Sequence, residues 1–123
     1  AQVGIIATGA LLHKALITAK DLEKKGIKVK VMNLATIKPL DTEAIIALAR
    51  ETKGIVTIEE HQVAGGMGSA VAECLASNYP VPIEFVGVKD SFSQSGTPDE
   101  IIEHYGMGVK DITKAVEKVL TRK

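Results

Sequence analysis

Short runs of valine and isoleucine alternate along this chain with longer segments in which apolar residues recur at helical spacing. The runs cover residues 3–8, 27–34, 54–60 and 83–88, and each is bounded by glycine, proline or charged residues, which is typical of buried strands. Strands that alternate with helices form right-handed crossovers in a mostly parallel sheet. The pattern therefore predicts one α/β domain over residues 1–123, with a parallel sheet covered by helices.

The first helical segment has a recognisable apolar face and end. The face comprises Leu12, Ala15, Leu16, Ala19 and Leu22. His13 and Lys14 lie outside this face, and we expect the His13 ring to be solvated. Gly26 follows the last turn, where glycine favours the left-handed conformation that ends many helices.

Two later helices are marked by a cap and by an apolar stripe. Asp41 is the expected N-cap of the second helix, with Leu40 and Ile45 packed around the cap. The stripe of the third helix comprises Ala70, Val71, Cys74 and Leu75. We expect the thiol of Cys74 to lie in the core.

The end of the chain predicts two further helices. Thr97 and Glu100 form a capping box, with Pro98 at the first helical position. Gly106 is expected to end this helix. The final helix then has an apolar stripe at Ile112, Ala115, Val116, Val119 and Leu120.

Composition and charge exclude several classes of partner. The chain is 46% hydrophobic but only 3% aromatic, so its core must be aliphatic. Lys and Arg number 15, as do Asp and Glu, which leaves no net charge to attract nucleic acid or an anionic membrane. No apolar run approaches the roughly 18 residues of a membrane span. The single cysteine excludes an internal disulfide and fits a reducing compartment, so we expect a cytoplasmic protein.

Two loops are expected to meet at the carboxyl ends of the strands, where open parallel sheets bind ligands. One loop follows the first strand at Thr8. The other follows the third strand and carries the candidates Glu59, Glu60, His61, Gly65, Gly66 and Gly68. Because the glycines precede a helix, their N–H groups could hold an anion. They match neither a Walker A loop nor GxGxxG, so we favour a tight turn and close packing of helix against sheet.

The charged trio before the glycines also permits two interpretations. Alternate strand residues point to opposite faces, so Glu59 and His61 should converge while Glu60 points away. The trio is either a general base or a cap and interface cluster at the rim of the sheet. The longest predicted loop adds Asp90 and Ser95 as candidates for a contact surface. No HExxH or CxxC spacing occurs, so we expect no metal site.

An ordered set of motifs over nearly the whole chain resembles the transketolase carboxy-terminal domain. The motifs are Gly4-Ile5-Ile6-Ala7-Thr8-Gly9, Thr36-Ile37-Lys38-Pro39-Leu40-Asp41, Glu59-Glu60-His61, Gly65-Gly66-Met67-Gly68-Ser69-Ala70-Val71, Asp90-Ser91-Phe92 with Ser95-Gly96, and Pro98-Asp99-Glu100-Ile101-Ile102 with Tyr105-Gly106. Each is weak alone, but their order and spacing together are specific. The resemblance implies a three-layer α/β/α domain with strand order 2-1-3-4. In the family a further antiparallel edge strand usually precedes the position of Val3, and we expect it to be absent here or reduced to Ala1-Gln2.

The same resemblance implies that the chain has no catalytic residue of its own. In this family thiamine diphosphate, Mg²⁺ and the activating glutamate belong to other domains, and the whole enzyme moves a two-carbon ketol unit between sugar phosphates. This chain would bind neither cofactor alone. Its glycine turn and the loop from Asp90 to Gly96 would face thiamine-diphosphate-binding domains, or a separate subunit, within a homodimeric enzyme.

Three alternatives stay open. The same type of domain occurs in deoxyxylulose-phosphate synthases and in the β chain of 2-oxoacid dehydrogenases, although His61 and the run from Lys38 to Asp41 are more similar to transketolase. A flavodoxin-like nucleotide-binding module would need a phosphate cradle after Thr8, where the chain is short and apolar. A pure interaction module would dock a partner through its loops and an unpaired sheet edge.

Overall fold

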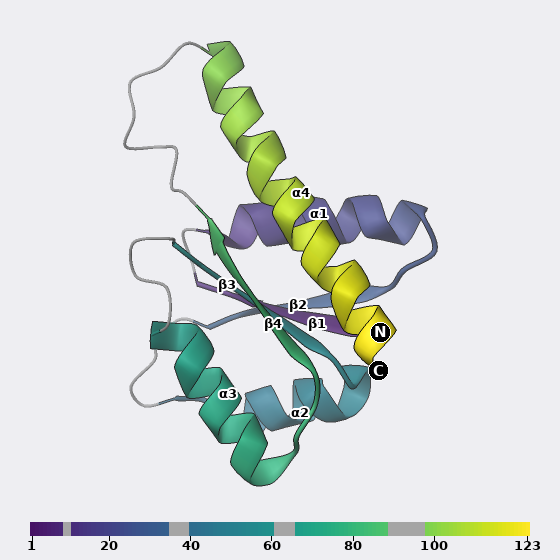
Figure 1. Ribbon diagram of the computed structural model, residues 1–123, viewed down its shortest axis with the longest axis vertical. Helices are drawn as coiled ribbons and strands as arrows, with labels where there is room; N and C mark the ends of the chain where they lie inside the picture. Colours follow the sequence, from purple (N-terminus) through teal and green to yellow (C-terminus); the bar gives the residue numbers. More distant parts are fainter. Residues whose placement is uncertain (9–10, 35–39, 61–65, 89–97) are drawn as a thin grey trace.

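The computed structural model describes residues 1–8, 11–34, 40–60, 66–88 and 98–123, the side chains of residues 98–108 excepted. Strands and helices alternate along these residues (Figure 1). The elements are β1 Val3–Ala7, α1 Leu12–Lys24, β2 Val29–Asn33, α2 Thr42–Thr52, β3 Ile55–Glu60, α3 Gly66–Asn78, β4 Ile83–Val88 and α4 Pro98–Arg122. Each strand lies within a run of valine and isoleucine that predicts it.

The described strands form one parallel sheet in the order β2-β1-β3-β4. Ile5 of β1 lies beside Val31 of β2 on one side and beside Val56 of β3 on the other. The direction of winding reverses between β1 and β3, so their carboxyl ends form the switch point at which such sheets bind ligands. The predicted parallel sheet and strand order are therefore confirmed.

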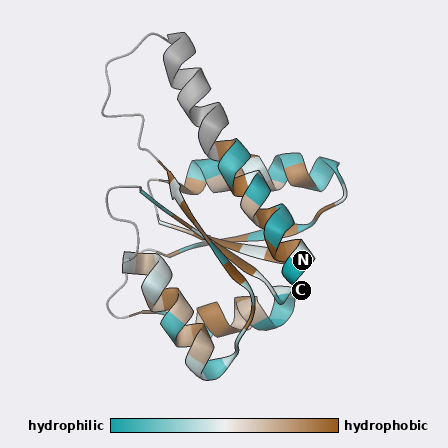
Figure 2. Ribbon diagram, in the orientation of Figure 1, coloured by the Kyte–Doolittle hydropathy of each residue, from teal (hydrophilic) through white to brown (hydrophobic). Residues whose placement is uncertain are grey.

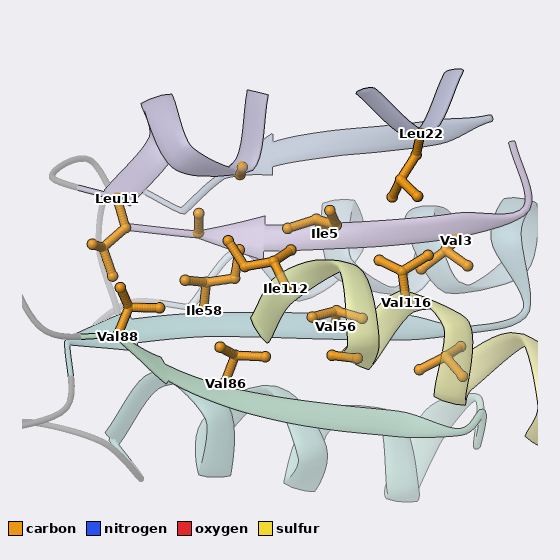
Figure 3. Packing of buried hydrophobic residues seen from close by; sticks show 14 residues of the cluster. Val3, Ile5, Leu11, Leu22, Val56, Ile58, Val86, Val88, Ile112 and Val116 are labelled. Atoms are coloured by element: carbon orange, nitrogen blue, oxygen red, sulfur yellow. The ribbon is translucent and has the colours of Figure 1, made fainter. Parts of the chain in front are cut away.

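Helices cover both faces of the sheet, with α1 and α4 on one side and α2 and α3 on the other (Figure 1). The two-residue period of each strand divides its side chains between two cores. Ile58 and Val86 pack in the core beneath α1 and α4 (Figure 3), whereas Ile6 and Ile55 pack in the core beneath α2 and α3. Hydrophobic residues concentrate on the strands and polar residues on the outer sides of the helices (Figure 2). The predicted α/β architecture is confirmed.

The apolar face predicted for α1 is wrong in part. Leu16 is 52% exposed and Ile17 is 46% exposed, whereas Lys14 is only 1% exposed. The hydroxyl of Thr18 is also buried, where it donates to the carbonyl of Lys14 at 2.8 Å. His13 is partly buried rather than solvated. Apolar residues occur on more than one side of this helix, so periodicity alone does not determine which side packs against the sheet.

Two predicted helix ends are confirmed. Gly26 follows α1 with a φ of 85°, and the N–H of Ile27 donates to the carbonyl of Leu22 at 2.9 Å. This is the hydrogen bond of a Schellman motif, in which glycine favours the left-handed position. At the start of α2, the Asp41 carboxylate accepts from the N–H of Ala44 at 3.2 Å, as an N-cap does.

The end of the chain forms one helix, which corrects the prediction of two helices separated at Gly106. Helix α4 continues through Gly106 and Gly108. Each glycine costs a helix only about 1 kcal/mol relative to alanine, and the second half of α4 packs firmly, with Ile112 fully buried. Pro98 begins the helix as predicted, while Thr97 lies outside the described residues.

Candidate functional site

The candidate site lies at the carboxyl ends of β1 and β3, beside the first turn of α3. Thr8 follows β1, Glu59 and Glu60 end β3, and Gly66 begins α3. The other predicted site residues lie outside the described part of the chain, namely His61, Gly65, Asp90 and Ser95. The approach of His61 to Glu59 therefore stays a prediction.

The carboxyl group of Glu59 is buried beneath α3. Glu59 shares its face of β3 with Ile55 and Thr57, and it is 5% exposed. Its Oε1 atom accepts a hydrogen bond from the backbone N–H of Gly68, in the first turn of α3. The first N–H groups of a helix have no partner within the helix, and its amino end attracts negative charge. Glu59 therefore acts as a cap for α3, supplied from the neighbouring strand.

At Gly68, helix α3 lies so close to the sheet that a side chain would not fit without movement of its neighbours. A Cβ atom there would lie 2.9 Å from Cδ1 of Phe85, 3.2 Å from Oε1 of Glu59 and 3.2 Å from Oγ1 of Thr57. Gly66 differs, since a Cβ atom there would meet no atom within 4 Å. Close packing of helix against sheet accounts for the glycine at 68 but does not require the glycine at 66.

Glu60 lies on the opposite face of the sheet from Glu59. It is in register with Val88 of β4, whose side chain belongs to the core beneath α1 and α4. The two carboxylates at the end of β3 are thus separated by the sheet, as the alternation of strand residues predicts. Glu60 is half-buried and remains available for contact at the rim.

The Glu59 carboxylate occupies a position at the amino end of α3 where an anionic ligand could otherwise bind. An anionic ligand at a switch point binds the free N–H groups of a helix, and at α3 the Glu59 carboxylate already accepts from the Gly68 N–H. In the part of the chain that the structure describes, no three side chains of His, Cys, Asp or Glu come together as a metal site. The described residues therefore provide capping and packing at this edge.

Cys74 lies in the core beneath α2 and α3, as predicted. It is 8% exposed, and burial raises the pKa of its thiol. The carbonyl of Cys74 accepts from Nδ2 of Asn78 at 2.7 Å. A buried thiol with a raised pKa behaves as a small hydrophobic side chain rather than as a nucleophile.

The outer strand β4 has features that sequence analysis missed. Phe85 is 59% exposed, and a groove of about 310 Å³ lies between β4 and α4, bordered by Gly87, Asp111 and Lys118 among others. Phe85 and the buried Val86 are adjacent in β4, so their side chains lie on opposite faces of the sheet, and the face with Phe85 is less buried. Its exposure depends on β4 being the last described strand of the sheet, which the strand pattern alone does not determine.

Comparison with protein families gives one match over most of the chain. The family described as "Transketolase, C-terminal domain" matches residues 1–112. The 6-deoxy-6-sulfo-D-fructose transketolase subunit SqwH of Clostridium sp. (strain MSTE9) is 44% identical over 122 residues, which cover 99% of this chain and 38% of that protein. The 1-deoxy-D-xylulose-5-phosphate synthase of Desulfitobacterium hafniense (strain DSM 10664 / DCB-2) is 40% identical over 125 residues, covering 98% of this chain and 20% of that enzyme.

A solved structure described as "Split gene transketolase, inactive beta4 tetramer" has the same fold. Its TM-score is 0.82 at 47% sequence identity, and the match covers 99% of this chain and 40% of that chain. The chain thus spans about two fifths, or less, of each of these similar proteins.

Proposed function

Because the chain belongs to the transketolase C-terminal domain family, we propose that it serves as the carboxy-terminal docking domain of a transketolase that depends on thiamine diphosphate. The complete enzyme would transfer a two-carbon ketol unit between sugar phosphates. The similar proteins include a transketolase subunit and a split-gene transketolase. Their names support an enzyme divided between polypeptides, one of which would carry this chain.

The observation that carries this proposal is the buried carboxylate of Glu59 at the amino end of α3. A diphosphate at the switch point would need the N–H of Gly68, which already donates to Glu59, and it would meet a negative charge there. No described group of side chains would hold Mg²⁺. The capped amino end of α3 supports the proposal that thiamine diphosphate and its metal bind elsewhere in the enzyme.

We place the docking surface at the carboxyl edge of the sheet. The half-buried Glu60 and the exposed Gly66 lie there, and the adjoining segments contain His61, Gly65, Asp90 and Ser95. Polar and glycine residues at a strand end permit close approach by another backbone. The complete enzyme is proposed to be homodimeric, with its active sites in the cofactor-binding part.

The proposal is tested with the full polypeptide that carries this chain, alone and mixed with a subunit that binds thiamine diphosphate. Calorimetry should detect no binding of thiamine diphosphate and Mg²⁺ to the polypeptide alone, and ketol transfer should require both components. Cofactor binding or turnover by a polypeptide that contains only this domain would overturn the proposal. A mixture that neither associates nor turns over with any tested ketose phosphate would also count against it.

His61 provides a test of the docking surface in the assembled enzyme. If His61 faces only the neighbouring domain, His61→Ala should weaken association while KM for both sugar substrates stays unchanged. A raised KM for one substrate with intact association would assign His61 to substrate binding instead. Glu60→Gln is a suitable companion variant, because it changes a neighbouring rim residue with little change in shape.

A second candidate is the corresponding domain of a deoxyxylulose-phosphate synthase, which the similarity to the Desulfitobacterium hafniense enzyme favours. The same mixed complex distinguishes the two, since a synthase would form 1-deoxy-D-xylulose 5-phosphate rather than transfer a ketol unit between sugar phosphates. The nucleotide-binding alternative is not favoured, because the chain belongs to another family.

A further inference from the structure

The fold gathers positive charge at the amino edge of the sheet, where the described strands begin. Helices that connect parallel strands run against them, so the carboxyl ends of the helices lie at this same edge. The start of β1 and the end of α4 meet there (Figure 1), and Nζ of Lys123 donates to the carbonyl of Gln2 at 2.6 Å. We call the following exposed cations at this edge the basic edge: Lys24, Lys25, Lys28, Arg50, Lys53 and Lys123.

Contacts through Gln2 and Gly54 make the basic edge continuous. The backbone N–H of Lys28 donates to Oε1 of Gln2 at 3.0 Å, so the turn after α1 lies beside Lys123, which contacts the same glutamine. A Cβ atom at Gly54 would lie 3.4 Å from Cδ of Lys123, so the neighbouring Lys53 is close as well. Cations from the ends of α1, α2 and α4 therefore share one surface.

Two carboxylates at this edge already pair with cations outside the basic edge. Glu51 contacts Lys30 at 2.9 Å, and Glu84 contacts both Lys118 and Arg122. In the part of the chain that the structure describes, no side-chain ion pair includes a cation of the basic edge. These cations therefore keep their charge available for another molecule.

The fold thus separates charges that balance over the whole chain. Glu23 and Glu117 are exposed acids in the last two turns of α1 and α4, and they are fewer than the cations of the basic edge. Lys and Arg together number 15, as do Asp and Glu, so a matching excess of negative charge lies elsewhere. Asp41, Glu59 and Glu60 are at the opposite, carboxyl edge. A chain without net charge therefore still has a basic surface.

One aromatic ring holds two cations of the basic edge together. The guanidinium carbon of Arg50 is 5.6 Å from the centre of the Tyr79 ring, and Nζ of Lys53 is 4.8 Å from it. The Lys53 ammonium also donates to the Tyr79 hydroxyl. The carboxyl end of α2 carries only about half a negative charge, which offsets a small part of the two positive charges. A carboxylate beside this ring could accept from both side chains.

The chemistry of the basic edge fits an acidic protein segment better than a membrane or a nucleic acid. Binding in a membrane surface needs apolar side chains that insert, and the exposed large hydrophobic residues of the described chain lie elsewhere, at Leu16, Ile17 and Phe85. A continuous phosphate backbone would meet the exposed carboxylates of Glu23 and Glu51 near the lysines. A protein segment presents separate carboxylates, which can pair with the cations and avoid these acids.

We propose that the basic edge is a docking surface for an acidic segment of a partner protein, with one carboxylate of that segment held between Arg50 and Lys53. The surface lies at the opposite edge of the sheet from Glu60 and Gly66, so both edges can be occupied at once. The proposal does not depend on the function of the complete enzyme.

Fluorescence anisotropy with a labelled decaglutamate peptide tests the surface in the full polypeptide that carries this chain. At low salt, Lys25→Glu combined with Lys28→Glu should raise the Kd about tenfold or more, because like charges then face the peptide. Lys110→Glu combined with Lys114→Glu is the matched control, since it makes the same change in net charge on exposed residues far from the end of α4. Equal weakening by both variants, or no binding by the wild type, would overturn the proposal.

Variants at the Tyr79 ring test the held carboxylate. Arg50→Gln and Lys53→Gln each remove one cation and should raise the Kd for decaglutamate about threefold or more, whereas Arg50→Lys keeps the charge and should retain most of the affinity. Tyr79→Leu removes the ring that holds both cations and should also weaken binding. Urea unfolding of the same variants separates binding from stability, and lost stability with an unchanged Kd would show that these residues serve the fold alone.

Two further probes distinguish the class of partner. Vesicles of phosphatidylserine and phosphatidylcholine, and a short DNA duplex, carry the same sign of charge as decaglutamate. At about 0.15 M salt both should bind more weakly than the peptide, and the Lys25→Glu and Lys28→Glu double variant should change their binding little. If either probe binds more tightly than decaglutamate and the double variant abolishes that binding, the basic edge recognises that polyanion and the proposed acidic protein segment is wrong.

Discussion

The buried carboxyl group of Glu59 accepts a hydrogen bond from the backbone N–H of Gly68, across the connection between β3 and α3. One residue ends a central strand and the other lies in the first turn of the next helix, so this bond sets where the helix begins relative to the sheet. The absence of a side chain at 68 allows the two to come together. Mutations at Glu59 and at Gly68 should therefore both destabilise the start of α3.

Replacing Glu59 should destabilise the domain through the start of α3. Glu59→Ala removes the acceptor of the Gly68 N–H, and we expect the free energy of unfolding to fall by about 1–2 kcal/mol. Glu59→Gln retains an acceptor and should cost less. Urea unfolding followed by circular dichroism measures both. Glu60→Ala, on the other face of the sheet, is the control and should change stability by less than about 0.5 kcal/mol; an equal loss for the two alanine variants would contradict the capping role.

The two glycines of the turn should differ in their tolerance of alanine. At Gly68 a methyl group would press on the buried Glu59 and Thr57, so we expect Gly68→Ala to lower stability by about 1–3 kcal/mol. At Gly66 the space is open, and Gly66→Ala should be neutral or stabilise the helix by up to about 1 kcal/mol. Thermal unfolding of the two variants tests this, and a cost at Gly66 as large as that at Gly68 would be inconsistent with the packing described.

An exposed ion pair between β2 and α2 should make a small part of the stability depend on pH. The Lys30 ammonium donates to Oε1 of Glu51 at 2.9 Å, and this hydrogen bond lowers the pKa of the Glu51 carboxyl. A carboxyl whose pKa is lower in the folded state adds stability above its unfolded pKa, and the contribution is lost as the pH falls through the folded pKa.

Lys30→Met should therefore raise the pKa of Glu51 toward its ordinary value and flatten the dependence of stability on pH in the acidic range. The titration of the Glu51 carboxyl by NMR, in the wild type and the variant, measures the change directly. Added salt should reduce the difference, since both side chains are exposed. Superimposable titration curves would show that the pair has no effect in solution.

The thiol of Cys74 should react slowly with disulfide reagents in the folded protein. Burial both restricts access and raises the thiol pKa, so at mildly alkaline pH less of the reactive thiolate forms than in an exposed cysteine. The rate should increase sharply on addition of denaturant. Cys74→Ala should lower stability by about 1 kcal/mol or less without affecting assembly; fast modification of the native protein would show that this part of the core opens readily.

The sequence predicted the centre of the sheet well because the two central strands, β1 and β3, are buried on both faces. A strand such as β3 then appears as a continuous apolar run, with Ile55, Val56 and Ile58 all inaccessible, and its length and boundaries are marked by glycine and charge. The helix caps at Gly26 and Asp41 could also be predicted, because each cap is formed by residues only a few positions apart in the sequence.

Other features were beyond sequence analysis because they depend on contacts between distant parts of the chain. Helix α1 has apolar residues on two sides, and packing against α4 and the sheet, rather than periodicity, buries Lys14 while Leu16 stays exposed. In α4 the packing of residues after Gly108 supports a helix that local propensity would end. At the candidate site, the contact of Gly68 with Phe85 requires the order of β3 and β4 in the sheet.

The strand order also has a consequence for how the chain reaches its native state during synthesis. Of the described strands β1 is synthesised first and can pair early with β2, but its other neighbour, β3, begins only at Ile55. Until then one side of a strand rich in isoleucine has no hydrogen-bonding partner, and one of its faces lacks α4, which follows all four described strands in the chain. Pairing between such distant segments is slow, so the nascent segment from β1 to β2 should depend on chaperones until α4 has been synthesised.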